Sequence, residues 1–429
     1  MPDPLRRVDG KAATPPRVLV VGGGVSALEA VLALRADAGM RVEIELIAPD
    51  PELRYPPLDV VEPFGLVPPR LELAGALAPL SVRHRLDAVE DVDTLEHWVR
   101  TREGAVLHYE ALVVAVGARP QRPVPGALVY GDPRSRVDFA RMLAAAESGH
   151  AERLVFAIPD GARWSLPLYE LAVMTARRLA AARFGGAGSR ARVVPRITVV
   201  TPEHAPLELF GGRASGRMLE YLEQLGIAFL PASRIVRVGR GEAVVESGPP
   251  APRSLRADRV VTLPLLRGSA FPGLPRDRDG FLPIDAHGAV RGVPDVYAAG
   301  DATDYPIKQG GLATQQADAA AAAIAARAGA PVTPMPFRPV LRGMLVTSER
   351  PRYLESDVMG HSGAHAADMP LWWPPTKVAG RHLAPFLAER FGARLPVPPP
   401  DERWLAGAVP YEIPLPVPDA VSIPVGRAS

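Results

Sequence analysis

The chain has 429 residues, of which 47% are hydrophobic and 22% are charged. This balance is typical of a globular protein with a sizeable core and room for two or three domains. The formal net charge is only +2, and no basic run carries interleaved aromatic residues, so we predict no nucleic-acid partner. Cysteine is absent, which excludes disulfide exchange, thiolate nucleophiles, cysteine-ligated zinc and iron–sulfur clusters.

Neither end of the sequence predicts export or a membrane span. No run of 18 or more apolar residues occurs, and the polar segment 1–16 lacks the apolar core of a secretory signal. We therefore expect a disordered lead-in over residues 1–16 and a cytoplasmic protein. Prolines gather at Pro396–Pro400 and Pro414–Pro418, which predicts an extended tail.

The first predicted element is a buried strand over Arg17–Val21, followed by a glycine-rich turn and a helix over Ser26–Arg35. Gly22 permits a tight turn and Gly24 permits close approach of backbone to a pyrophosphate, while the small Ala27 lets the helix pack on the strand. The phosphates would lie at the helix N-terminus, beside Val25 and Ser26, where free N–H groups favour negative charge.

A strand over Val42–Ile47 completes a βαβ unit of the expected length. An acidic residue at the end of this strand should bind a ribose. Ala48 stands at that position, so Asp50, two residues later, is our candidate for the ribose contact; the alternative is a ribose held by backbone alone.

A proline-punctuated loop begins at Tyr55, and three strand-like segments over 88–92, 97–100 and 106–109 predict a small antiparallel insert. A buried strand over 111–116 then ends in a small-residue turn, where we assign Gly117 to the cofactor site.

A second α/β unit follows the first. We predict strands over 154–158, 197–200, 227–230 and 259–263, and helices over 168–181 and 214–225. The turn after its first strand, Pro159–Ser165, has one glycine where a dinucleotide fingerprint needs three. The side chains of Arg163 and Trp164 would crowd a pyrophosphate there. Glu203 follows the second strand and could still bind a ribose hydroxyl.

The chain then returns through a strand ending in Gly300 and Asp301 to a long helix that we predict over 312–328. We place Gly311, Leu312 and Ala313 at the start of this helix against the cofactor, because helix N-termini stabilise negative charge. Lys308, just before the helix, is the candidate catalytic residue; the alternative is an exposed loop lysine.

The glycine-rich turn and the string Val296-Tyr297-Ala298-Ala299-Gly300-Asp301 together resemble the two FAD motifs of the FAD-dependent pyridine nucleotide–disulfide oxidoreductase superfamily. The resemblance covers roughly residues 17–390. Tyr169-Glu170 after Leu166-Pro167, and Lys308-Gln309-Gly310-Gly311, are most similar to the sulfide:quinone reductase and type II NADH dehydrogenase branch. In such proteins the residue matching Asp301 binds the ribityl–phosphate end of the flavin.

This resemblance implies an α/β fold with two Rossmann-like, three-layer dinucleotide-binding domains. The FAD domain would be discontinuous, over 17–120 and 265–330, with a degenerate NAD(P)-binding-like domain over 121–264 between its parts. A C-terminal irregular interface region would occupy 331–429. FAD is the implied cofactor.

We predict a FAD-dependent oxidoreductase that transfers two electrons through flavin N5, with an unidentified donor and a quinone as the candidate acceptor. Without cysteines, cysteine-dependent sulfide oxidation is excluded. NAD(P)H use stays open, so one alternative is an NAD(P)H-dependent reductase with a nonstandard nucleotide loop. Others are a flavin-binding partner or sensor without turnover, and an oxidase that reduces O₂.

Candidate substrate-pocket residues are aromatic or cationic, and each has the alternative of a core or lid role. They are Tyr55, Trp164, Tyr169, Trp372 and Lys377. The expected partner is a small-molecule substrate or a quinone, and a homodimer is compatible with the sequence. We do not expect membrane-surface docking through 378–391, because Pro385 interrupts that segment. No histidine spacing predicts a metal site, and Glu29 receives no role.

Overall fold

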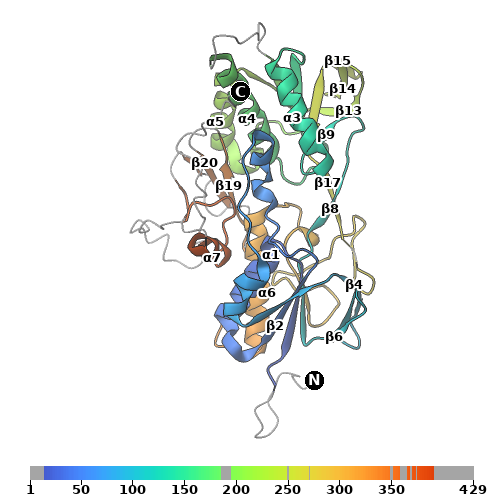
Figure 1. Ribbon diagram of the computed structural model, residues 1–429, viewed down its shortest axis with the longest axis vertical. Helices are drawn as coiled ribbons and strands as arrows, with labels where there is room; N and C mark the ends of the chain where they lie inside the picture. The colour runs from blue at the N-terminus through green and yellow to red at the C-terminus, as the bar shows by residue number, and fades with distance from the viewer. Residues whose placement is uncertain are drawn as a thin grey trace, which may run out of the picture.

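The computed structural model describes residues 14–184, 195–248, 251–269, 271–347, 351–357, 365–367, 370–372 and 374–390. The expected lead-in therefore lies outside the described residues except for 14–16, and the predicted proline-rich tail lies outside them entirely. Figure 1 shows two α/β units arranged along the long axis of the molecule, with β2 and β6 in the lower one and α3, α4 and α5 in the upper one.

The first unit is built on five parallel strands in the order β18-β7-β1-β2-β3. Val, Leu and Ile predominate in these strands, as suits a parallel sheet that is covered on both faces. Since the strands are parallel, the turn after β1 and the turn after β18 lie at the same edge of the sheet. The strands are β1 Arg17–Val21, β2 Glu43–Ala48, β3 Val82–Leu86, β7 Ala111–Val114 and β18 Val296–Ala298.

Two helices cover one face of this sheet. Helices α1 (Val25–Ala38) and α6 (Gly310–Arg327) lie side by side (Figure 1). Val18 and Val20 of β1 share a core with them. Leu19 and Val21, which point the opposite way along the strand, pack against the antiparallel insert on the other face. This insert consists of β4 Val89–Asp93, β5 Trp98–Thr101 and β6 Val106–His108 and confirms the predicted one.

The second unit has another five-stranded parallel sheet, in the order β12-β11-β10-β16-β9. The predicted α/β class with two Rossmann-like units is thereby confirmed. The strands are β9 Leu128–Val129, β10 Arg153–Ala157, β11 Arg196–Val200, β12 Ile227–Leu230 and β16 Arg259–Thr262; the helices are α3 Pro133–Glu147, α4 Leu166–Phe184 and α5 Gly211–Gln224.

The chain passes between the units on an antiparallel pair, β8 (Ala118–Gln121) with β17 (Leu265–Gly268). Shorter elements decorate both units. They are the 3-10 helices η1 Gly39–Arg41, η2 Pro56–Phe64, η3 Ala78–Leu80, η4 Glu208–Phe210 and η5 Gly300–Ala302, helix α2 Leu73–Leu77, and the antiparallel strands β13 Arg234–Val238, β14 Glu242–Glu246 and β15 Arg253–Arg256.

The described part of the C-terminal region is more regular than its composition predicted. Strands β19 (Val340–Leu345), β20 (Arg352–Asp357) and β21 (His365–Ala367) form an antiparallel sheet. Helix α7 (Leu383–Arg390) buries Leu383, Leu387 and their neighbours in the core of the first unit, so this apolar face is used inside the protein. Among the described helices, none is both long and apolar enough to cross a bilayer. The domain boundaries given above remain our proposal.

Candidate functional site

The turn after β1 requires glycine at its first position. Gly22 has φ +130°, and a β-carbon on it would collide with the carbonyl oxygen of Ala115 at the end of β7. The Gly22 N–H donates to Ile47 of β2 at 2.9 Å. Because the turn is held between two neighbouring strands in this way, its position relative to the sheet edge is fixed.

Gly24 differs, because no protein atom forbids a side chain there. The nearest atom to a β-carbon on Gly24 would be the Arg54 carbonyl oxygen, at 3.9 Å, and φ is −105°. Gly24 is the N-cap of α1 and provides no side-chain cap, so the first N–H groups of α1 keep no intrahelical partner. This open, donor-lined helix start fits the pyrophosphate of a dinucleotide.

The two predicted cofactor segments meet directly. The hydroxyl of Ser26 lies 3.4 Å from the carbonyl oxygen of Ala299. Gly300 has φ +74°, and a β-carbon on it would lie 2.6 Å from that same hydroxyl oxygen. The Gly300 N–H donates to the side chain of Gln316 on α6 at 2.8 Å. The turn after β1, the turn after β18 and the start of α6 therefore form one continuous surface.

Asp301 lies at this junction and is half-buried. Burial raises the pKa of Asp301, and the positive charge of Lys308 opposes that rise. Within the described part of the chain, no group donates a hydrogen bond to this carboxylate. A half-buried carboxylate without donors fits the hydroxyl groups of a ribityl chain, which can supply them.

Lys308 is buried rather than exposed, with 5% of its surface accessible. Its ammonium donates to the carbonyl of Thr303 and lies 3.8 Å from the centre of the Phe281 ring. Burial lowers the pKa of Lys308 to about 8. These contacts hold a cation next to Asp301, just before α6.

Helix α6 begins within the same surface. The side chain of its N-cap, Gln309, accepts from the N–H of Leu312 at 2.8 Å and donates to the carbonyl of Arg342 at 2.8 Å. A β-carbon on Gly311 would lie 3.1 Å from the Gln309 amide oxygen, while Leu312 and Ala313 are buried. Leu312 N–H is thus already capped, whereas the N–H groups of Gly310 and Gly311 donate to no other described residue.

The remaining candidate cofactor residues lie at the same sheet edge. Asp50 follows β2 and is half-buried, with its carboxylate 3.6 Å from Arg54. Gly117 has φ +70° and open space around it. Tyr55 is half-buried at the N-cap of η2 and packs against the core of the first unit. Their roles toward a cofactor or substrate remain predictions.

The corresponding turn of the second unit is filled by its own side chains. Arg163 pairs with Asp279 at 3.0 Å, and its backbone carbonyl accepts from the Lys308 N–H at 3.2 Å. The Trp164 ring packs edge-on against Phe210 at 5.9 Å between centroids. This turn is therefore tied to the first unit and to the core, with side chains where a pyrophosphate would need bare backbone.

The carboxylate of Glu203, which follows β11, already accepts hydrogen bonds from three side chains. Its carboxylate accepts from the hydroxyls of Ser165 at 2.9 Å, Tyr169 at 2.5 Å and Thr201 at 3.0 Å. Glu203 is 9% exposed and Tyr169 is completely buried. The predicted pocket residue Tyr169 thus lies in a buried hydroxyl cluster around the acid that would otherwise meet a ribose.

A buried ion pair that sequence patterns did not identify joins α4 to the C-terminal region. The Lys377 ammonium contacts the Glu170 carboxylate and donates to the carbonyl of Met344 at 2.6 Å. The same Glu170 oxygen accepts from the N–H of Val346 at 2.6 Å, and its other oxygen is buried without a partner among the described residues. Glu170 is inaccessible to solvent. In the sequence, the string Tyr169-Glu170, which carries part of the family resemblance, was the one indication of this ion pair.

Trp372 lies close to this pair. The side chain is 1% exposed, contacts Tyr353 edge-on at 5.2 Å and donates to the Thr376 carbonyl at 3.3 Å. The structure thus places Trp372 in the core, and its role as a pocket wall remains a prediction.

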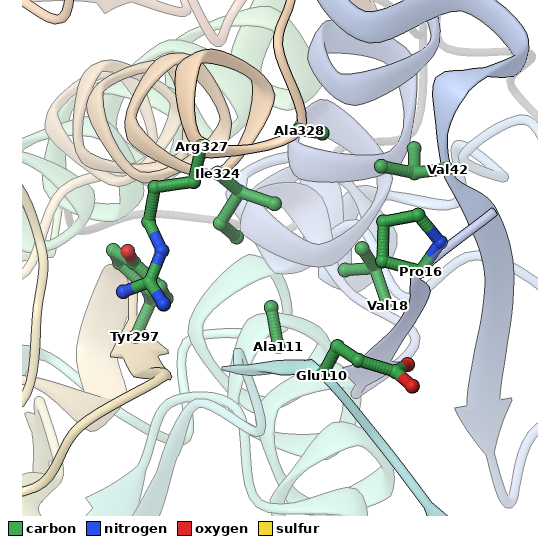
Figure 2. A pocket seen from close by; sticks show the side chains of 9 residues that line it. All are labelled: Pro16, Val18, Val42, Glu110, Ala111, Tyr297, Ile324, Arg327 and Ala328. Carbon is green, nitrogen blue, oxygen red and sulfur yellow. The ribbon is translucent and has the colours of Figure 1, made fainter. Parts of the chain in front are cut away.

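Two pockets lie away from the turn after β1. Figure 2 shows one at the amino ends of β1, β2 and β7, lined by residues such as Pro16, Val42 and Glu110. The other lies at the carboxyl ends of β10, β11 and β12, where open α/β sheets bind ligands. Arg234 crosses it and pairs with both Asp160 and Glu246, and Glu203 is not among its lining residues.

Residues 16–325 match the family model described as pyridine nucleotide-disulphide oxidoreductase. The match covers well over half of the chain, and the chain belongs to this family. It is an oxidoreductase, and FAD is its cofactor, in agreement with the fit of the site described above.

Individual proteins are more distant. An NADH dehydrogenase-like protein of Mycobacterium tuberculosis is 28% identical over 307 residues, which cover 66% of this chain and 72% of the relative. The sulfide:quinone oxidoreductase of Aquifex aeolicus has a TM-score of 0.71 at 17% identity, covering 82% of this chain and 86% of its own. NDH2 of Plasmodium falciparum, in complex with NADH, has a TM-score of 0.55 at 15% identity, covering 67% and 64%. At these identities the two structures establish the fold alone.

Proposed function

We propose that the protein is a FAD-dependent oxidoreductase that moves two electrons from a small-molecule donor to a quinone without taking them from NAD(P)H. When bound, FAD supplies the two-electron chemistry at its N5 atom. The observation that carries the proposal is the complete engagement of Glu203 inside the second unit.

In a dinucleotide-binding unit, the acid after the second strand is needed for the ribose hydroxyls. Here three hydroxyl donors already occupy the Glu203 carboxylate. A ribose would have to displace buried partners, and each buried donor left unpaired costs about 1–3 kcal/mol. The second unit therefore keeps the Rossmann-like sheet but supports no nucleotide at its usual place.

The turn of the second unit supports the same proposal. Arg163 is held by Asp279 and stacks at 4.8 Å on Phe281, whose ring also contacts Lys308. Arg163 and Lys308 thus bring two cations to one ring beside the proposed flavin site. We propose that they exclude nicotinamide and present positive charge to the donor or to the reduced cofactor.

The acceptor side is proposed from the contacts at the start of α6. A β-carbon on Gly310 would lie 2.8 Å from Val378 and 3.6 Å from Pro57, so η2 and the segment after Lys377 both reach this helix end. The buried Glu170–Lys377 pair directly precedes Val378. A buried carboxylate with one unpartnered oxygen can hold a proton, and we propose that this pair supplies protons to a quinone bound near Tyr55.

The acceptor is tested with protein reduced anaerobically by dithionite and then mixed with a short-chain quinone or with O₂. We expect the oxidised flavin absorption to return faster with quinone than with O₂ at equal concentration. Peroxide formed in proportion to the reduced flavin, with no quinone response, would favour the oxidase alternative and contradict the proposal.

The second candidate function is an NAD(P)H-dependent reductase. The relative of M. tuberculosis, named as NADH dehydrogenase-like, favours it. It requires a nucleotide path that bypasses Glu203, such as the pocket crossed by Arg234. Reduction of the flavin by NADH or NADPH distinguishes the two candidates.

A further inference from the structure

A mixed carboxylate–imidazole cluster lies between α1, α6 and the start of α7. Glu29 of α1, Asp318 of α6 and His382, just before α7, each offer one ligand atom, and these atoms all lie within 4.8 Å of one another. The three residues are about 290 and 60 positions apart in sequence, so no ligand-spacing motif could reveal them. Only the packing of α7 against α1 and α6 brings them together.

Two of the three ligand atoms have no partner. The Oδ1 atom of Asp318 and the Nε2 atom of His382 are both buried, and neither makes a hydrogen bond to any described residue. They lie 4.0 Å apart. Orphaned buried polar atoms are rare in native proteins and call for a ligand or a water, and here both orphans belong to one cluster.

The third ligand, Glu29, is held by backbone N–H groups at the start of the C-terminal helix. Glu29 is inaccessible to solvent, and its carboxylate accepts the N–H groups of His382 at 2.8 Å and Leu383 at 2.6 Å. These two bonds orient the carboxylate and leave further lone pairs on both oxygens. Backbone donors that fix a ligating carboxylate in this manner are typical of the surroundings of protein metal ions.

The two carboxyl groups of the cluster are joined by a side-chain hydrogen bond between Glu29 and Asp318, so one of them carries a proton that a metal ion would displace. Two ionised carboxylates at this depth would repel each other, and desolvation adds to the cost of both charges. The cation that acts on them is Arg381, which is exposed and therefore screened by water. A divalent ion among the three ligands would neutralise both carboxylates and satisfy both orphaned atoms.

The ligand set suits a transition-metal ion after a small inward shift. Zinc bonds to histidine nitrogen and to carboxylate oxygen at about 2.0–2.2 Å in tetrahedral geometry, so His382 Nε2 and Asp318 Oδ1, which lie 4.0 Å apart, would approach each other by about 0.6 Å on binding. Imidazole with carboxylates suits zinc better than calcium or magnesium, which prefer oxygen alone.

We propose that Glu29, Asp318 and His382 bind one divalent transition-metal ion of the zinc class, with water as the fourth ligand. The ion would be structural and would hold the C-terminal segment against α6. Ala379, three residues before His382, accepts from the Thr314 hydroxyl of α6 at 2.9 Å, and Val378 covers Gly310. The ion would thus hold the C-terminal segment over the first turn of α6. It would take no part in electron transfer.

The test uses the full-length flavin-loaded protein, freed of metal with a chelator and titrated with zinc chloride by calorimetry. We expect one zinc per chain and a rise in the melting temperature with zinc concentration. We expect H382Q and D318N to bind zinc with an affinity about tenfold or more below that of the wild type. The His382 side chain is 18% exposed in the wild type. H108Q alters an exposed histidine of β6 and should bind zinc like the wild type.

Absence of stoichiometric zinc binding by the wild-type protein would overturn the proposal. Equal binding by the wild type and H382Q would overturn it too, because the zinc would then lie elsewhere. Should a variant lose its flavin or its fold, the wild-type melting temperature with and without zinc decides alone. A shift that saturates at one equivalent supports the site, and no shift contradicts it.

Discussion

Gly22 and Gly24 stand two residues apart and are required for different physical reasons. At Gly22 the protein itself forbids a side chain, because φ is positive and Ala115 is in the way. At Gly24 the protein leaves room, so only a ligand explains the need for bare backbone. The two positions therefore separate the needs of the fold from those of FAD.

We predict that Gly22→Ala destabilises the protein by about 2–4 kcal/mol, since backbone must move to relieve the collision. Gly24→Ala should change the stability of the flavin-free protein by no more than about 1 kcal/mol, the usual effect of an altered helix cap. It should nevertheless weaken FAD binding by about tenfold or more, which is about 1.4 kcal/mol. Denaturant unfolding and FAD titration measure both quantities. Unaltered FAD affinity in Gly24→Ala would contradict the placement of the pyrophosphate.

Asp59 in η2 provides a pH-dependent prediction. Burial, assisted by the nearby charge of Glu62, raises the pKa of Asp59 to about 6, above the ordinary value of 3.8. Since the folded protein then binds more protons than the unfolded chain between these values, stability falls as pH rises through this window. Asp59→Asn removes the free-energy cost of ionising this buried carboxyl group. The variant should therefore be more stable than the wild type at pH 7, by about 1–2 kcal/mol. The difference should shrink as pH falls toward 4. A difference in the free energy of unfolding that is independent of pH would show that Asp59 is not the group responsible.

At the scale of elements, the βαβ unit was predictable because glycines follow a continuous apolar strand, and the antiparallel insert because buried and exposed residues alternate along its strands. Helix α3 was not predicted, since its sequence is polar on average and its apolar stripe is weak. The sheet β19–β21 was hidden by the proline- and tryptophan-rich composition around it. The helices that it packs against, α4, α5 and α6, come from earlier parts of the chain.

The Glu170–Lys377 pair joins α4 to the C-terminal segment. Lys377→Met should cost about 3–5 kcal/mol, because it leaves the Glu170 charge buried and unpaired. Glu170→Gln combined with Lys377→Met should recover much of this loss, since no charge then remains. Thermal or denaturant unfolding of the single and double variants forms the required cycle. A double variant as unstable as the sum of the single ones would contradict the pairing.

At the scale of the whole molecule, the sequence predicted which cofactor is held better than which reaction is run. The FAD contacts follow from local strings such as Gly22–Ala27 and Val296–Asp301, whose spacing fixes their place on the sheet. The state of Glu203 could not be predicted, because Ser165, Tyr169 and Thr201 converge on it only in the folded protein. From sequence alone Glu203 stood as an available ribose ligand, whereas in the structure three hydroxyls occupy it.

The central claim is that the first unit holds FAD while the second unit no longer delivers electrons from a nicotinamide nucleotide. Anaerobic addition of NADH, and separately of NADPH, to the flavin-loaded protein tests it directly through the flavin absorption band. We predict no bleaching at millimolar nucleotide, with full bleaching by dithionite as the control that the flavin is reducible. Rapid and complete bleaching by either nucleotide would contradict the claim and establish the NAD(P)H-dependent reductase instead.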